Sequence, residues 1–111
     1  MIILGIESSC DETGVAIVQD GKTLLAHSVA SSMDIHAQYG GVIPEIAARS
    51  HIEAMLPTIQ SVIEQFSREK KIAINEAWNC IDGIAVTYGA GLSGSLLIGV
   101  LTARTLAIMK D

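Results

Sequence analysis

A short polar segment near the N-terminus carries the side chains best suited to chemistry. It lies between two apolar runs, residues 2–4 and 15–18, and holds two acids, three hydroxyls and a thiol. Carboxylates can take a proton or orient an amine or a water, and hydroxyls with backbone N–H groups can cradle phosphate. Acids would repel phosphate unless a metal or a protonated group lay between. The members of this candidate loop are Ser8, Ser9, Cys10, Asp11, Glu12 and Thr13. Equally, they could form a solvated hairpin tip whose acids touch nothing.

A second candidate is the glycine-rich segment Gly89-Ala90-Gly91-Leu92-Ser93-Gly94. It precedes a predicted helix that Ser93 can cap, and a helix N-terminus with close backbone approach favours an anion. The segment is neither a P-loop nor a dinucleotide fingerprint, because it lacks the lysine and the required spacing. The alternative is a tight strand-to-helix turn in which glycine only permits close packing.

The histidines and cysteines do not form a metal-binding pattern. His27, His36 and His51 are far apart in the sequence, and no two share helical spacing. We therefore expect no metal site from this chain alone, and we expect His51 to be a surface or interface residue of the first long helix. Cys10 and Cys80 form neither a disulfide framework nor a zinc site, and Cys80 is expected to pack as a small hydrophobic residue.

Three strands are predicted at the start of the chain. They run from Ile2 to Glu7, from Gly14 to Gln19 and from Thr23 to Ala30, with a tight turn at Asp20-Gly21. Short connections of this kind predict an antiparallel meander. The acids and hydroxyls of the candidate loop would then lie at the tip of the first hairpin.

A long amphipathic helix is predicted to begin at Pro44, which suits the first helical position. Its apolar positions recur at spacings of three and four. Pro57 lies inside this pattern, so the helix should be kinked or divided in two. The charged residues 67–71 should close it. The predicted buried face consists of Ile52, Leu56, Ile59, Ile63 and Phe66.

The remainder of the chain predicts a strand and a second helix. Asn75 is a candidate cap for a short turn, residues 81–88 read as a mostly apolar central strand, and a helix should follow Ser93 to the end. The order is three antiparallel strands, helix, strand, helix. We predict an α/β fold and, because a central strand needs cover on both sides, the first part of a larger domain.

Composition excludes several classes of protein. The 111 residues suffice for one small domain, and a formal charge of −5 provides no basic footprint for nucleic acid. The N-terminus lacks the basic region of a secretory signal, and the longest apolar segment, residues 96–109, is too short to span a bilayer. A cytoplasmic protein is the simplest expectation.

Three segments carry a resemblance to a known family. They are residues 5–13 (Gly-Ile-Glu-Ser-Ser-Cys-Asp-Glu-Thr), 36–51, which contain Gly40-Gly41-Val42-Ile43-Pro44-Glu45, and 87–99, which contain the glycine-rich segment. Together they resemble the tRNA N6-adenosine threonylcarbamoyltransferase family, formerly described as O-sialoglycoprotein endopeptidase. The similarity extends over essentially the whole chain. It implies an actin-like ATPase (RNase H-like) fold of two lobes, of which this chain would be most of the first.

The resemblance also implies a reaction and its residues. The family transfers a threonylcarbamoyl group from threonylcarbamoyl-AMP to N6 of the adenosine beside the tRNA anticodon and releases AMP. Asp11 and Glu12 would be the catalytic or orienting pair. The loop residues Ser8, Ser9, Cys10, Thr13, Gly89, Gly91, Ser93 and Gly94 would contact substrate or phosphate.

In two respects this sequence lacks what the resemblance implies, the metal ligands and a proline in the glycine-rich segment. The family's single metal ion, iron or zinc, is held by two histidines one helical turn apart and a later aspartate, all expected after Asp111. Ala90 stands where the family usually has proline. We therefore expect the isolated chain to be inactive and to lack the metal site.

A partner is also implied, a shorter paralogous subunit that would dock on the helices of the first lobe. The alternative is that these helices only cover their own sheet. The chain could also be a non-catalytic scaffold of the same fold. A sugar or acetate kinase of this fold would need a different first loop, Asp-x-Gly-x-Thr.

Overall fold

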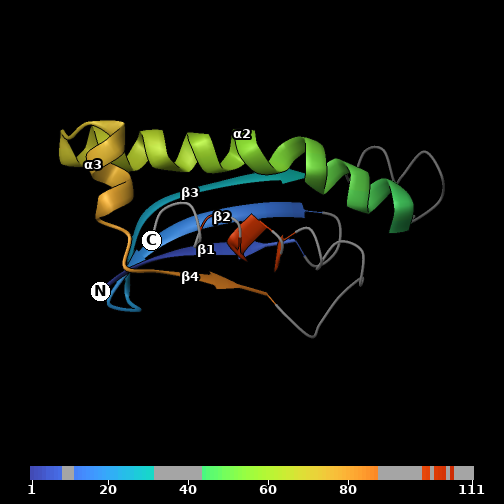
Figure 1. Cartoon of the computed structure of the whole chain (residues 1–111), viewed down its shortest axis with the longest axis horizontal. Coiled ribbons are helices and arrows are strands. Elements are labelled where there is room, and N and C mark those ends of the chain that lie inside the picture. The colour runs from blue at the N-terminus through green and yellow to red at the C-terminus, as the bar shows by residue number, and fades with distance from the viewer. Residues whose placement is uncertain (9–11, 32–43, 88–98, 101, 105, 107–111) are drawn as a thin grey trace.

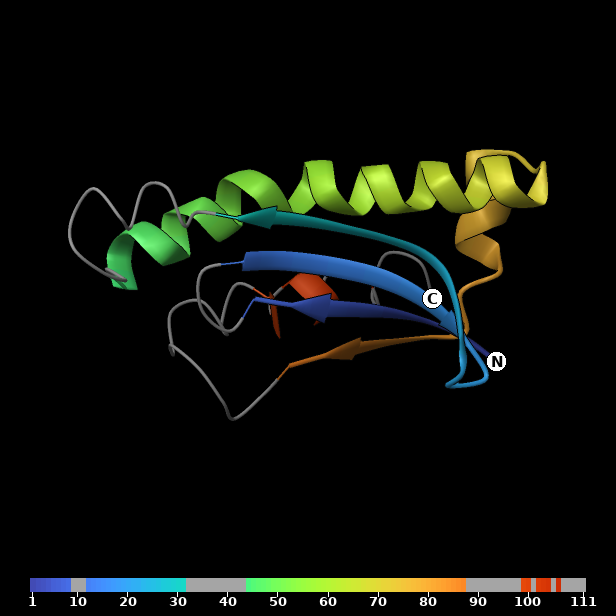
Figure 2. The same cartoon turned by 180° about the vertical axis from the view of Figure 1, so that it is seen from behind.

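The computed structural model describes residues 1–8, 12–31, 44–87, 99–100, 102–104 and 106. Its strands are β1 (Ile2–Glu7), β2 (Glu12–Gln19), β3 (Thr23–Ser31) and β4 (Gly83–Val86), and its helices are α2 (Pro44–Lys70) and α3 (Ile74–Asn79). The strands form one sheet in the order β3-β2-β1-β4. The long helix α2 lies along one face of this sheet, as the two opposite views of Figures 1 and 2 show.

The predicted antiparallel meander is confirmed. β1 pairs with β2 and β2 with β3, both antiparallel. Asp20 and Gly21 have φ values of 55° and 68°, the left-handed conformation that a tight hairpin turn requires. β2 begins at Glu12 instead of Gly14, because Glu12 and Thr13 pair with β3 although they lie beyond the end of the β1 pairing. These two residues therefore belong to a strand, not to the hairpin tip.

β4 runs parallel to β1, from Gly83 to Val86, and is shorter than the predicted strand 81–88. It was expected to be a central strand, and that was wrong for the part of the chain that is described, where it pairs with β1 alone and forms an edge. Its residues are only partly buried or exposed. The central position was predicted from the apolar composition of the strand. Ile84 and Val86 account for this composition because they pack against the core, on one face of the sheet.

Of the two predicted effects of Pro57, a kink or a division into two helices, the division was wrong, because α2 is continuous through Pro57. Figures 1 and 2 show an unbroken, gently bent ribbon. Pro57 is exposed, and residues buried on either side of it hold both halves against the same sheet. The hydroxyl of Thr58 donates to the Ala54 carbonyl at 2.7 Å, a local bond that is compatible with a bend.

The buried face of α2 differs from the predicted one. Ile59, Ile63 and Phe66 are buried, as expected, but Ile52 and Leu56 are 60% and 63% exposed. The residues that precede these two in the sequence, His51 and Met55, are buried in their place. The members of the buried stripe are His51, Met55, Thr58, Ile59, Val62, Ile63, Phe66 and Ser67.

The end of α2 falls within the predicted charged segment. Lys71 takes the left-handed conformation with φ 56°, and the N–H groups of Lys71 and Ile72 donate to the carbonyls of Arg68 and Ser67. This pair of bonds is the Schellman arrangement, which satisfies two orphan carbonyls.

Two smaller predictions near α3 were wrong. Asn75 does not cap this helix, because the cap position is Ala73 and Asn75 lies within the first turn. Cys80 is exposed instead of packed, because it follows the last turn of α3 as its C-cap residue.

The core lies between the sheet and the helices. Inward-facing strand residues alternate along β1 and β2 and meet α2, Ala77 of α3 and Ala103. The described residues between 99 and 106 are helical and pack on the same face as α2, because Ala103 and Leu106 contact this core. The main strand contributors are Leu4, Ile6, Val15, Ile17 and Ala26. On the opposite face of the sheet, the residues that line an open groove include small ones, such as Gly5, Gly14 and Ala16, the polar Glu7, Glu12 and Thr87, and the apolar Val29.

The outer edge of β3 is covered by a side chain from α2. The Gln65 amide donates to the His27 carbonyl at 3.0 Å and its oxygen accepts from the His27 N–H at 3.4 Å. The amide thus occupies hydrogen-bonding groups that a further strand would use. β3 also exposes Leu24 and Val29.

We predict that Gln65→Ala promotes self-association through this edge. Light scattering after size-exclusion chromatography should show a larger species whose fraction rises with protein concentration. Gln60→Ala is the matched control, because Gln60 is exposed on the same helix. A Gln65→Ala chain as monomeric as the control would contradict the prediction.

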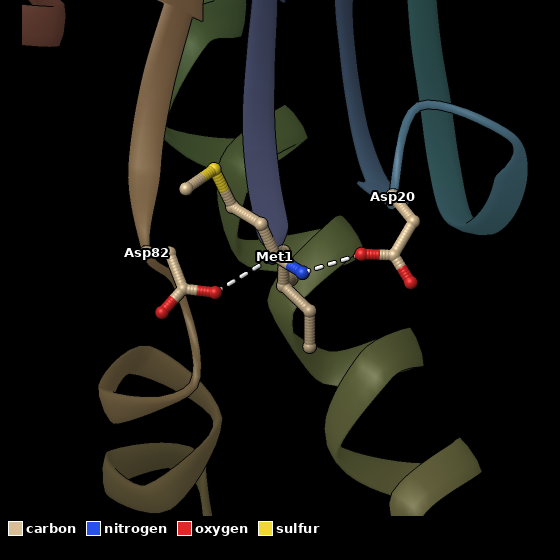
Figure 3. A network of polar contacts seen from close by, with 4 residues as sticks. Met1, Asp20 and Asp82 are labelled. Atoms are coloured by element: carbon tan, nitrogen blue, oxygen red, sulfur yellow. Dashed lines mark hydrogen bonds and ion pairs between the residues drawn. The ribbon is translucent and has the colours of Figure 1, made fainter.

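The N-terminal amine is tied to the end of the sheet near α3, as Figure 3 shows. The Met1 ammonium lies 2.5 Å from Asp20 Oδ1, and the Ile2 N–H donates to Asp82 Oδ2 at 2.7 Å. The hydrogen bond to Asp20 raises the pKa of the amine above its ordinary value of 8.0. A raised pKa in the folded state adds stability below the pKa of the unfolded chain, and this stability is lost as the pH rises through the folded value.

We therefore predict a small, pH-dependent stabilisation by the free amine. The melting temperature of the free-amine chain should exceed that of the N-acetylated chain near neutral pH, and the difference should vanish in alkaline solution. In Asp20→Asn, which keeps a residue suited to positive φ, the difference should be much smaller, with only the attraction of Asp82 left to raise the pKa of the amine. A difference that persists at alkaline pH would contradict the assigned pair.

Candidate functional site

The two candidate loops start side by side at one edge of the sheet. β1 and β4 are parallel neighbours, so their carboxyl ends, from which loops 8–13 and 89–94 depart, lie together. The Thr87 N–H donates to the Ile6 carbonyl at 3.1 Å, and the Thr87 hydroxyl donates to Glu7 Oε2 at 2.5 Å. The departure points of the two loops are therefore linked by backbone and side-chain bonds.

Ser8 is buried against the helical residues that follow the glycine-rich segment. Its side chain is almost wholly enclosed, and a Cβ atom built on Gly99 would lie 2.5 Å from Ser8 Oγ and 3.2 Å from Val86 Cγ2. Only glycine permits this approach. Ser8 thus connects the first loop to the third of the segments singled out in the sequence.

Thr13 connects the first loop to the second segment. Thr13 Oγ1 lies 2.6 Å from Nδ1 of His51, and these two residues are 2% and 1% exposed. His51 was expected to be a surface or interface residue, and this was wrong. Its imidazole can be buried because the Thr13 hydroxyl satisfies one ring nitrogen.

A signal for the burial of each of these two residues was present in the sequence. His51 precedes Met55 by four residues and Val62 by eleven, and so belongs to the buried stripe. Thr13 alternates with Val15 and Ile17, which places all three on the inner face of β2. Because threonine and histidine are polar, the burial of Thr13 and His51 was not predicted.

Glu12 points to the opposite face of the sheet, where it is exposed. An open groove of about 550 Å³ lies on this face. Glu7, Glu12 and Thr87, at the loop ends of their strands, are among its lining residues, and its floor has small side chains such as Gly5 and Ala16. A Glu12 carboxylate in this position is open to a ligand.

The other proposed site residues fall outside the described residues. These are Ser9, Cys10, Asp11, Gly89, Gly91, Ser93 and Gly94. Their roles stay predictions, as do the contacts of Ser8, Glu12 and Thr13 with a substrate. Two hydroxyl residues of the candidate loop are described, Ser8 and Thr13. Thr13 is hydrogen-bonded to His51 and Ser8 is buried, so both side chains face the helices and not the groove.

The described residues do not fit a metal centre, because no three His, Cys, Asp or Glu side chains lie together among them. Among the same residues, no helix has the length and apolar character needed to cross a membrane.

The contact at Gly99 gives a testable consequence. Alanine in place of a helical glycine ordinarily stabilises a helix by about 1 kcal/mol. Here we predict the reverse, a loss of about 1–3 kcal/mol from overpacking against Ser8 and Val86. Urea unfolding of Gly99→Ala measures it.

The double variant Gly99→Ala/Ser8→Ala is the control for this contact. Removal of Ser8 Oγ should recover part of the lost stability, so the two substitutions should not be additive. A Gly99→Ala chain more stable than the original would contradict the close approach.

The sheet order, the parallel β1–β4 pair and the helices on the core face define an α/β fold of the actin-like ATPase class. A solved structure of YeaZ from Pseudomonas aeruginosa has the same fold, with a TM-score of 0.62 and 20% identity over 99% of this chain and 41% of that chain. A model of the tRNA N6-adenosine threonylcarbamoyltransferase family matches residues 23–111. The chain belongs to this family.

Curated relatives agree with the family assignment. The tRNA N6-adenosine threonylcarbamoyltransferase of Fusobacterium nucleatum subsp. nucleatum is 50% identical over 111 residues, which are 100% of this chain and 30% of the relative. The protein of the same name from Methylobacillus flagellatus is 51% identical with the same coverage. The chain thus spans about 30% of the length of these relatives.

Proposed function

We propose that the chain is the N-terminal part of the first lobe of a tRNA N6-adenosine threonylcarbamoyltransferase, without transferase activity by itself. The observation that carries this proposal is the convergence of the three characteristic segments. Glu7 meets Thr87, Ser8 meets Gly99, and Thr13 meets His51. Residues far apart in the sequence thus surround one loop.

The proposed reaction is an acyl transfer from threonylcarbamoyl-AMP to tRNA. The adenosine N6 attacks the carbamoyl carbon, a C–N bond forms, the bond from that carbon to the phosphate oxygen breaks, and AMP leaves. The attacking nitrogen must lose a proton, and the developing oxyanion and phosphate charge need donors. The acceptor in this proposal, N6 of the adenosine beside the tRNA anticodon, is taken from the reaction of the family.

In this proposal Asp11 and Glu12 take or orient the N6 proton. Exposure of Glu12 in the open groove supports its access to substrate. The backbones of loops 8–13 and 89–94, with Ser9, Cys10 and Ser93, would bind the adenylate. The single metal ion of the intact enzyme, iron or zinc, would be held by residues beyond Asp111.

The proposal also includes a shorter paralogous subunit as partner. Ile52, Leu56 and Ile74 are exposed on α2 and α3, and a groove of about 390 Å³ lies between these helices and Leu106. An apolar surface of this kind suits a protein partner. It also supports the second candidate function, a non-catalytic dimerisation module in the same complex, which needs the helices but not the acids. A cytoplasmic location is proposed for either.

A chimera separates these functions. Residues 1–111 would replace the matching first part of the Fusobacterium nucleatum relative, and formation of modified adenosine in tRNA would be measured with threonylcarbamoyl-AMP as donor. We expect activity from the chimera and none from the isolated chain. An inactive chimera that still binds the paralogous subunit in gel filtration would favour the dimerisation module.

A further inference from the structure

The bond between Thr13 and His51 joins two elements at the base of the candidate catalytic loop. Thr13 is the second residue of β2, and His51 lies in the second turn of α2. Thr13 Oγ1 and His51 Nδ1 lie 2.6 Å apart, within hydrogen-bonding distance, and the tautomer of the ring decides which of the two donates.

Burial makes this contact specific. Both side chains are almost wholly removed from water, so loss of one partner leaves the other without that bond in a site that excludes solvent. In a site without solvent, a polar side chain has few other hydrogen-bond partners, so the geometry of the pair is restricted. The contact therefore sets where β2 begins relative to α2.

The loop is held at both ends from the same side. Ser8 is enclosed against Gly99 at one end, and Thr13 is bonded to His51 at the other. Glu12 is adjacent to Thr13 and, by strand alternation, points to the opposite face and into the open groove. A rotation of Thr13 about the strand axis would turn Glu12 with it.

We propose that His51 is a positioning residue for Glu12, the first residue of β2. It acts through the Thr13 hydroxyl, without contact with substrate, and keeps the Glu12 carboxylate directed into the groove. The inference rests on the proposed transferase function for its kinetic consequence, but its structural consequence belongs to the chain alone. A displacement of about 1 Å at a reacting group can lower a rate on the order of 100-fold.

The first test uses the 111-residue chain. In the wild-type chain, ¹⁵N spectra of the histidine ring should show Nδ1 of His51 in a hydrogen bond. Thr13→Val, which keeps shape and removes the hydroxyl, should change this ring signal and shift the backbone amide signals of Glu12 and its loop neighbours. Thr13→Ser should restore both.

Thr58→Val is the matched control. Thr58 is also a buried threonine, and its hydroxyl bonds within α2 to Ala54. This variant should lose stability without changing the His51 ring signal or the loop amides. Equal loop shifts in Thr13→Val and Thr58→Val would overturn the inference, as would unchanged loop shifts in Thr13→Val.

The second test uses the chimera described above. Thr13→Val and His51→Leu should each lower kcat on the order of 100-fold with KM for tRNA unchanged. Thr13→Ser and His51→Asn, which keep polar groups near the same positions, should recover much of the rate. The double variant should lose less than the combined effect of the two single variants, because both single variants remove the contact between Thr13 and His51.

The outcomes of the two tests are distinct. If the unmodified chimera makes no product, the transferase proposal fails and the loop shifts alone decide the positioning role. If the chimera is active and Thr13→Val retains full kcat, the positioning role is wrong and the transferase proposal stands.

Discussion

Replacement of Phe66 with alanine is expected to lower the free energy of unfolding by about 3–5 kcal/mol. Phe66 is 1% exposed and is the largest of the fully buried side chains in the described residues. Its ring fills the space between α2 and the sheet, and the structure cannot fully close the cavity left by alanine. Domains of this size are stable by only about 5–15 kcal/mol, so a large share would be lost.

Leu56→Ala is the matched control for Phe66→Ala. Both residues lie on α2 and both were predicted to be buried, but Leu56 is largely exposed. Its replacement should change stability by less than about 0.5 kcal/mol. Urea titrations of the two variants measure the free energy of unfolding of each. Similar losses would show that α2 presents a different face to the sheet.

Replacement of the loop acids is expected to have the largest effect on activity. In the chimera, Glu12→Gln and Asp11→Asn should each lower the rate of threonylcarbamoyl transfer by about 10²–10⁴-fold, the usual contribution of a general acid or base. Glutamine keeps the length of Glu12 and removes its charge. The folded structure should persist, because Glu12 is exposed.

Glu69→Gln is the control for charge removal, because Glu69 is exposed near the end of α2, far along the chain from the loop. Its rate should equal that of the unmodified chimera. Wild-type rates in both Glu12→Gln and Asp11→Asn would contradict the assignment of these acids. Loss in only one of them would identify the residue that takes the proton.

The sequence predicted the strands well because their signals are local. Short apolar runs, a turn at Asp20-Gly21 and alternation along β2 are each contained within a few residues. The beginning of β2 was missed because Glu12 and Thr13 are paired with β3, a partner that the loop's own composition does not reveal.

The helix errors have a different cause. From hydrophobicity, Ile52 and Leu56 were predicted to be buried and His51 to be exposed. The packing of α2 against the sheet instead exposes Ile52 and Leu56 and buries His51. Pro57 carries a strong local signal for a break, but burial of residues on both sides outweighs it. The contacts that join the three segments, such as Thr13 with His51, depend on this packing and could not be predicted from spacing alone.

A crystal structure of the chimera with AMP tests the central claim most directly, which is that loops 8–13 and 89–94 bind one adenylate at the carboxyl ends of β1 and β4. The account predicts the AMP phosphate in contact with backbone N–H groups of both loops, with the Glu12 carboxylate facing the same cavity. AMP bound away from both loops, with the sheet and α2 unchanged, would contradict it.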